Sequence, residues 1–395
     1  MQRHRITVIG GGFAGLTAAI TAAEAGAEVT LHEAHHTLGG RARTAEGPYR
    51  TNEGPHALYR RGPHWTWLAQ RGLLGPLAPL PTREAARFRF HHAGALRRTP
   101  PLRFLRHTLR TAEQAPVDSD FRTWATRVAG PEAAAQAAAY SGVALFHHDP
   151  GALSARFVQE RLHRAAALPP EARYVRGGWG RLVERMAARA RELGVRIETK
   201  SRLTELPLTD GPVVVATSLA AASGLLGDAS LRGEGGRTVL LDLALRTRKG
   251  DPFVVSDLDA PGWIERFTAQ DPSLAPAGEQ LIQAQLPIAP PSSASSSASK
   301  ADGVTHAERL LDLGFPGWRE REVWRREAVS SGRTGALDRP GTTWRDRPAI
   351  DRGDGVYLVG DEVAAPGVLS EVSFTSAVEA VSLALRARRL DLKSA

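Results

Sequence analysis

The first 33 residues constrain this chain most, because they combine two strand-like runs, a glycine-rich turn and a helix. Residues 5–9 read RITVI, and a second strand-like run, EVTLH, covers 28–32. Gly10, Gly12 and Gly15 lie between them in the spacing G-x-G-x-x-G, ahead of a small-residue helix predicted over 14–25. Strand, glycines, helix and strand in this order predict a parallel β-α-β unit that binds a dinucleotide.

Each part of this unit has a role in dinucleotide binding. Gly10 allows a tight turn, Gly12 lets a pyrophosphate approach the backbone, and Gly15 lets the helix pack close to the strand. The start of the helix offers unpaired N–H groups to phosphates, and Glu33 is placed to bind a ribose diol and to repel a 2′-phosphate. The alternative is a glycine-rich turn in an ordinary β-α-β unit. The predicted contacts are Gly10, Gly12, Phe13, Ala14, Gly15 and Glu33.

Composition excludes several classes of protein. The 395 residues are enough for two domains, and 42% of them are hydrophobic, as in globular proteins. No run of about 18 apolar residues predicts a membrane span, and the chain enters a strand without a signal-peptide pattern. A cytoplasmic location is therefore expected. The absence of cysteine excludes disulfides, thiolate metal sites and cysteine nucleophiles.

The positive charge is carried almost entirely by arginine. The net charge is +9, the pI is about 10.5, and all but four of the 51 basic residues are arginine. Runs such as 103–110 could bind a polyanion, but no helix-turn-helix, zinc-finger or RNA-binding signature accompanies them. We therefore expect no nucleic-acid partner, and a weak association with membrane surfaces stays open.

Two further segments fit the same cofactor. Gly39, Gly40 and Arg41 follow the second strand, where a loop passes the phosphates and an arginine can pair with them. Residues 51–59 (TNEGPHALY) then place a stiff Gly54–Pro55 turn beside His56 and Tyr59.

Together these motifs resemble the FAD-dependent amine oxidase and phytoene desaturase superfamily. The resemblance implies a glutathione-reductase-like, Rossmann-type FAD domain of α/β class, interrupted by an inserted α+β substrate domain. It covers roughly 1–60, 173–225 and 345–390. The implied division is 1–60, 173–225 and 345–395 for the FAD domain and 61–172 and 226–344 for the substrate domain.

The resemblance also assigns cofactor contacts farther along the chain. It implies that Asp361, after a strand ending at Gly360, holds the ribityl chain of the flavin. Residues 372–374 would lie against the flavin ring, ahead of a helix predicted over 375–388. A strand over 202–206 would meet the adenine through the backbone of Leu203. The implied contacts are Gly40, Arg41, Gly54, Pro55, Leu203, Gly360, Asp361, Val372, Ser373 and Phe374. The resemblance implies FAD as the cofactor, bound without a covalent link.

The intervening segments match the superfamily loosely or not at all. Strands are predicted over 238–245, 253–256, 280–286 and 322–328, with a short hairpin over 88–96. The Pro- and Ser-rich stretch 289–303 is predicted to be a mobile loop, followed by a helix over 305–313.

The chain has one dinucleotide fingerprint, so a second site for a nicotinamide donor is not expected. The expected reaction is therefore oxidation of a small or lipophilic substrate by hydride transfer to the flavin. Oxygen or another acceptor would then reoxidise the flavin. His56 and, more weakly, Tyr59 are the candidate catalytic residues. The resemblance implies that a typical amine oxidase would hold a water with a lysine near the flavin N5. Lys249 lies in a polar run and is predicted to be at the surface, which argues against such an oxidase. An amine or amino-acid oxidase and a redox-neutral module that needs reduced flavin remain alternatives.

Adjacent histidines, one pair of them followed by Asp149, are candidate metal ligands. They occur at 35–36, 91–92 and 147–148. Neighbours in sequence rarely converge on one ion, so no metal site is predicted. The sequence does not indicate an oligomeric state.

Overall fold

Strands from distant parts of the chain build a parallel sheet around the N-terminal strand. The structure is a computed structural model that describes residues 4–53, 57–80, 82–167, 169–233, 235–290, 299–331 and 335–394. The strand order is β15-β9-β1-β2-β8, and every recorded pair is parallel. The strands are β1 (Arg5–Ile9), β2 (Glu28–His32), β8 (Arg196–Glu198), β9 (Val213–Val215) and β15 (Val356–Leu358).

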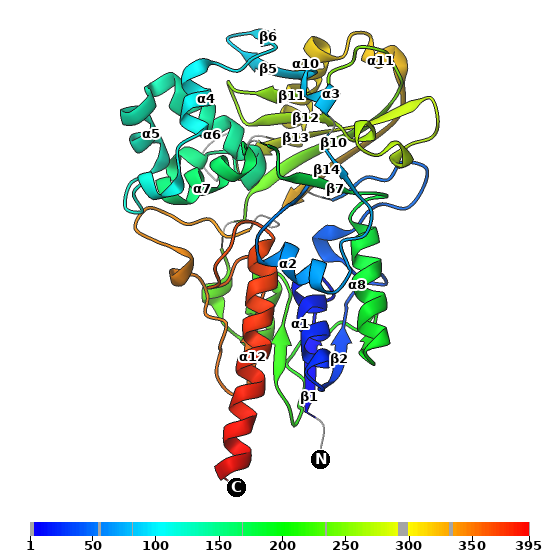
Figure 1. The fold of residues 1–395 in the computed structure, drawn as a ribbon, viewed down its shortest axis with the longest axis vertical. Coiled ribbons are helices and arrows are strands. Elements are labelled where there is room, and N and C mark those ends of the chain that lie inside the picture. Colours follow the sequence, from blue (N-terminus) through cyan, green and yellow to red (C-terminus); the bar gives the residue numbers. More distant parts are fainter. Residues whose placement is uncertain are drawn as a thin grey trace.

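Three helices pack side by side on this sheet, as the lower half of Figure 1 shows. Helix α1 (Phe13–Glu24) lies between α8 (Gly180–Glu192) and α12 (Glu371–Ser394). Ala18, Ala19 and Ala22 of α1 are fully buried, because side chains this small allow close helix packing. The predicted β-α-β unit is therefore confirmed.

A second, seven-stranded sheet occupies the upper half of Figure 1, in the order β14-β10-β13-β12-β11-β5-β6. Helix α10 (Lys300–Gly314) covers one of its faces, where Leu310 and Leu311 pack among buried aliphatic side chains. The strands are β5 (Phe88–His92), β6 (Ala95–Arg97), β10 (Arg237–Arg246), β11 (Val254–Asp257), β12 (Gly262–Arg266), β13 (Glu279–Ile288) and β14 (Glu322–Ser331).

A helical cluster and a small sheet complete the upper half. The cluster has its own core, in which Phe121, Trp124 and Phe157 are buried. Its helices are α4 (Leu102–Thr108), α5 (Phe121–Ala129), α6 (Pro131–Leu145) and α7 (Ala155–Ala165), and the sheet has the order β3-β7-β4. The remaining strands and α-helices are β3 (Ala57–Tyr59), β4 (Leu77–Pro79), β7 (Ala172–Val175), α2 (Pro63–Gln70), α3 (Thr82–Ala85), α9 (Leu219–Leu226) and α11 (Trp318–Arg321).

None of the helices in the described ranges combines the length and hydrophobicity that a membrane span needs.

The structure corrects the predicted loop at 289–303. Residues 291–298 lie outside the described residues, but Ser299 caps α10, which begins at Lys300. The Ser299 hydroxyl accepts a hydrogen bond from Asp302 N at 3.1 Å, and the Asp302 carboxylate accepts one from Ser299 N at 2.7 Å. This capping box starts the helix five residues earlier than the apolar pattern predicts, because its signal is polar.

Helix α12 also begins earlier than predicted, at Glu371 instead of residue 375. The Glu371 carboxylate accepts a hydrogen bond from Val368 N at 3.0 Å, which stabilises the first turn. The domain boundaries at 60, 172, 225 and 344 remain a prediction.

Candidate functional site

The glycine turn after β1 leaves open space where a pyrophosphate would lie. A Cβ atom on Gly10, whose φ is +108°, would lie 2.4 Å from the Ala216 carbonyl oxygen. A Cβ atom on Gly15 would lie 1.8 Å from the Gly10 carbonyl oxygen. A Cβ atom on Gly12, in contrast, would meet nothing closer than Gly39 O at 4.0 Å. Packing therefore requires glycine at 10 and 15, whereas Gly12 faces the space that a ligand could fill.

Glu33 connects this turn to the end of β2. Its side chain is buried, and its two oxygens accept hydrogen bonds from Gly11 N and His35 N, both at 2.8 Å. The carboxylate thus lies at the carboxyl ends of β1 and β2, where open α/β sheets bind their ligands.

The predicted strand around Leu203 is wrong. Residues 201–206 form no strand, because backbone hydrogen bonds carry the chain across the end of β2 instead of alongside it. Ser201 N donates to Glu33 O at 2.9 Å, and Lys200 N donates to His35 O at 2.9 Å. Leu203 is partly buried against the core of the parallel sheet. The segment still lies beside Glu33, so an adenine contact by its backbone stays a prediction.

Arg41 and Asp361 form an ion pair that closes the site from opposite ends of the chain. Burial lowers the pKa of Arg41, but the Asp361 carboxylate more than offsets this, so the pKa of Arg41 lies above its usual value.

The two glycines before Arg41 lie close to the glycine turn after β1. Gly39 N donates to Gly11 O at 2.8 Å, and a Cβ atom on Gly40 would lie 3.8 Å from Gly12 Cα.

The start of α12 presents its side chains to the core. Val372 and Phe374 are each 1% exposed, and the Phe374 ring packs against Phe13 at 5.7 Å and Trp67 at 5.6 Å between ring centroids. The backbone of residues 372–374 is therefore the part that could contact a cofactor. Ser373 is also buried, and Gly360 N donates to the Ser376 hydroxyl at 3.1 Å.

An ionic cluster fixes this helix start. Arg164 of α7 contacts the Glu371 carboxylate at 2.9 Å and the Glu171 carboxylate at 2.7 Å. Burial raises the pKa of Glu371, partly opposed by Arg164. The buried ring of His64 lies 3.5 Å from the same carboxylate, and burial lowers the pKa of His64 to about 4, so this ring is neutral at pH 7.

A cleft of about 380 Å³ opens at Glu362, which follows Asp361 in the chain. Its lining includes Glu362, His147, His148 and Arg347. Burial, together with the charge of Asp361, raises the pKa of Glu362 to about 7. A carboxyl group in this state can gain or lose a proton near neutral pH.

The two faces of the seven-stranded sheet differ in chemistry. Ile282, Ala284 and Leu286 of β13 face α10, whereas the alternate residues Gln283 and Gln285 point to the opposite side. On that side, Arg326 contacts Asp242 at 2.7 Å and Gln283 Nε2 donates to Asn52 O at 3.3 Å. This polar face therefore contacts the chain at Asn52, which precedes the predicted flavin segment 54–56 in the sequence.

Glu265 of β12 is a second buried acid on this face. Its carboxylate accepts hydrogen bonds from the Tyr174 hydroxyl at 2.8 Å, Trp263 Nε1 at 2.9 Å and Gln270 Nε2 at 2.7 Å. Burial raises the pKa of Glu265, opposed by these three donors. The result is a buried carboxylate enclosed by aromatic side chains.

Two further tyrosines lie near this carboxylate. Burial, together with the charge of Glu265, raises the pKa of Tyr59 to about 12, although Arg164 opposes the shift. Burial also raises the pKa of Tyr140, whose ring packs edge-on against Trp263 at 5.9 Å between centroids. Of the two predicted catalytic residues, Tyr59 lies in the described part of the chain, and it lies near the buried Glu265 carboxylate.

Other sequence predictions have different outcomes. Gly54, Pro55 and His56 lie outside the described residues, so their roles stay predictions. Lys249 is exposed in the turn after β10, as predicted. Sequence reasoning missed Glu265 and Tyr140, because they lie in segments without a recognisable motif and meet only in the folded chain.

Comparisons with known proteins agree with this geometry. The NAD(P)-binding Rossmann-like domain family matches residues 8–72. The comparison with curated protein sequences gives no match.

Several solved structures share the fold at low sequence identity. An oxidoreductase from Methanosarcina mazei is 16% identical, with a TM-score of 0.73 over 96% of this chain and 100% of that chain. Cyclohexylamine oxidase from Brevibacterium oxydans is 15% identical, with a TM-score of 0.69 over 99% of this chain and 100% of that one. A reduced UDP-galactopyranose mutase is 14% identical, with a TM-score of 0.69 over 97% and 96%, respectively.

The glycine turn, Glu33 and the Arg41–Asp361 pair thus belong to a Rossmann-like domain inside a larger shared fold. The predicted α/β fold with an inserted second unit is confirmed. The chain has the fold expected from its resemblance to the FAD-dependent amine oxidase and phytoene desaturase superfamily, a fold that it shares with cyclohexylamine oxidase.

Proposed function

We propose that the protein is an FAD-dependent oxidoreductase that removes a hydride from a C–H bond of a small or lipophilic organic substrate. The observation that carries this proposal is the convergence of Glu33, Gly12, Arg41 and Asp361 on one site. Each of these residues has the chemistry that a different part of FAD needs.

The residues fit the cofactor in order along its length. Glu33 would bind the ribose diol of the adenosine, and Gly12 with the start of α1 would hold the diphosphate. Asp361 would bind the ribityl hydroxyls, and the backbone of residues 372–374 would face the ring. When bound, the flavin supplies the hydride acceptor, and O2 or another acceptor removes the electrons.

The protein's own residues would orient the substrate and control charge. The N-terminal end of α12 carries a positive dipole, which stabilises negative charge beside it. Arg164 pairs with Glu371 at that end and so offsets part of the negative charge beside the helix start. Tyr59 and Glu265 provide polar groups on the substrate side.

The absorption spectrum of the purified protein tests the proposal. We expect the visible bands of an oxidised flavin, or their appearance after FAD is added to colourless protein. Under anaerobic conditions, a true substrate should bleach these bands, and admitting O2 should restore them. A folded protein that stays colourless and takes up no FAD would contradict the proposal.

A second candidate, a flavin amine oxidase, is favoured by the buried Glu265 carboxylate and the rings around it. An ammonium group is attracted both by a carboxylate and by the faces of aromatic rings. Amine substrates should then release hydrogen peroxide, and Glu265→Gln should raise KM for a cationic amine at least tenfold. For a neutral lipophilic substrate, the same change should leave KM within about threefold.

A redox-neutral reaction is the remaining alternative. It would show no bleaching by any substrate and would show activity only after chemical reduction of the flavin.

A further inference from the structure

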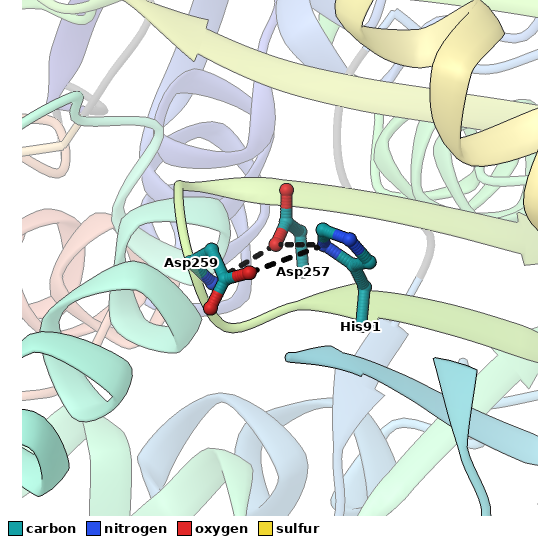
Figure 2. Close-up of side chains that lie close together, drawn as sticks. All are labelled: His91, Asp257 and Asp259. Carbon is teal, nitrogen blue, oxygen red and sulfur yellow. Dashed lines mark hydrogen bonds and ion pairs between the residues drawn. The ribbon is translucent and has the colours of Figure 1, made fainter. Parts of the chain in front are cut away.

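A cluster of histidine and carboxylate side chains lies at the end of β5, away from the glycine turn. His91 of β5 and Asp257 of β11 are register partners in a parallel strand pair, and Asp259 lies in the following turn. Figure 2 shows the three side chains facing one another, with dashed lines joining His91 to both aspartates. One ligand atom from each of them lies within 4.8 Å of the other two.

We propose that His91, Asp257 and Asp259 form a binding site for a divalent transition-metal ion of the zinc type. His91 Nδ1 lies 2.8 Å from Asp257 Oδ1 and 3.7 Å from Asp259 Oδ2. Ligand atoms about 2.1 Å from a tetrahedrally coordinated zinc ion lie about 3.4 Å apart. The two observed distances lie on either side of that value, so small side-chain movements would create the coordination geometry.

The neighbouring side chains hold the two carboxylates in place. His306 Nε2 of α10 lies 2.7 Å from Asp257 Oδ2, the oxygen that His91 does not contact. His92 Nδ1 lies 3.2 Å from Asp259 Oδ1, and His92 Nε2 lies 3.1 Å from the Glu132 carboxylate on α6. Metal-binding carboxylates are characteristically oriented by such outer hydrogen bonds.

The charge of the cluster favours a cation. Many acids in this arginine-rich protein pair with arginine, but the ion pairs of Asp257, Asp259 and Glu132 within the described residues all involve histidine. Asp257 is 3% exposed, so its charge is poorly compensated by water. Neutral imidazole with carboxylates is a ligand set that suits zinc and related ions, with water completing the coordination.

Such an ion would fasten two segments that are distant in sequence. β5 and β11 pair over only four residues, Phe88–His91 with Val254–Asp257, and the ion would bind at the end of this short ladder. Binding should therefore stabilise the sheet edge that joins the two parts of the inserted unit. This role does not depend on the flavin or on the reaction.

Zinc titration of untagged, chelator-treated protein tests the site, with calorimetry for affinity and Co²⁺ absorption for coordination. We expect one Zn²⁺ per chain, a rise in Tm of about 2–5 °C at saturating zinc, and at least tenfold weaker binding in His91→Ala and Asp257→Asn. His306→Ala, which removes an outer hydrogen bond, should weaken binding about tenfold.

His36→Ala is the matched control, because His36 belongs to an exposed histidine pair outside the cluster, and this variant should bind zinc like the wild type. If Asp257→Asn does not fold, Asp259→Asn decides the question, since Asp259 is largely accessible and its loss should also weaken binding tenfold. The absence of saturable binding in the wild type would overturn the proposal. So would binding that survives His91→Ala but is lost in His147→Ala.

Discussion

Arg41 donates a hydrogen bond to the carboxylate of Asp361, although the two residues are 320 positions apart in the sequence. Arg41 follows the glycine pair that contacts the first turn, and Asp361 follows the last strand of the parallel sheet. The pair therefore connects the two segments that would enclose the proposed FAD site. The resemblance predicts both residues as cofactor contacts.

Replacing Asp361 tests whether this pair serves the cofactor. Asp361→Ala should weaken FAD binding about 10- to 100-fold, because it removes a ribityl contact and leaves Arg41 without its carboxylate. Quenching of flavin fluorescence during titration of the apoprotein measures the affinity. Asp351→Ala, at an exposed position near the same strand, should leave the affinity unchanged.

Two glycine substitutions separate folding from cofactor binding. Gly12→Ala should change the free energy of unfolding of the apoprotein by less than about 1 kcal/mol, because its φ is −79° and the nearest atom to the new Cβ is 4.0 Å away. It should nevertheless abolish FAD uptake, since the methyl group occupies the space proposed for the diphosphate. Circular dichroism and flavin titration on the same sample measure both effects.

Gly15→Ala should have the opposite pattern. Its Cβ would lie 1.8 Å from Gly10 O, so α1 must move away from β1, at a cost on the order of 3 kcal/mol or more. We expect a lower Tm or insoluble protein before any test of binding. Equal loss of FAD in both variants, with equal loss of stability, would show that Gly12 acts only in packing.

The outcomes for particular residues show what the sequence can predict. The β-α-β unit that ends at Glu33 was predicted correctly because it is local, and its turn, helix and strand each leave a signal within a few residues. Leu203 was placed in a strand that does not form, because hydrogen bonds to Glu33 and His35 decide the path of that segment. Those partners are distant in sequence.

The polar clusters were beyond the reach of sequence reasoning for the same reason. His91 and Asp257 become neighbours only when β5 pairs with β11, and Glu265 meets Tyr174 only when two sheets pack together. The start of α10 was missed although Ser299 and Asp302 carry a capping signal, because the surrounding serines resemble a loop.

The pH dependence of stability should reveal Glu362. Its pKa is raised to about 7 in the folded protein from an ordinary value near 4.5. The folded state therefore holds this proton more tightly, and the stability that the proton contributes is present below pH 4.5 and is lost as the pH rises through 7. Glu362→Gln should stabilise the apoprotein by about 1–2 kcal/mol at pH 8, after discounting for partial exposure, and by much less at pH 4.5.

Urea unfolding of wild type and Glu362→Gln at the two pH values measures this difference. Glu46→Gln, at an exposed position, is the matched control and should change the unfolding free energy by less than about 0.5 kcal/mol at either pH. A gain for Glu362→Gln that is equal at both pH values would mean that the side chain is not titrating in this range.

His107 of α4 should limit stability in acid. Its ring is 1% exposed against Phe121 and Trp124, and neither ring nitrogen has a hydrogen-bond partner among the described residues. Burial lowers the pKa of His107 from 6.5 to about 4. Between these pH values the unfolded chain therefore binds a proton that the folded protein does not bind. The stability that the protein has with a neutral His107 ring is therefore fully present above pH 6.5 and is lost as the pH falls toward 4.

His107→Leu should remove both the two unpaired ring nitrogens and the loss of stability in acid. Leucine is apolar and fills a volume similar to that of histidine. We expect a gain in unfolding free energy of about 1 kcal/mol at pH 7.5, from the loss of two unpaired nitrogens, and a further gain of about 2 kcal/mol at pH 5. His36→Leu, at an exposed position outside the helical cluster, should change the free energy by less than about 0.5 kcal/mol at both pH values. If His107→Leu shows no additional gain at pH 5, the ring must accept its proton in the folded state, and the helical cluster must open to water around it.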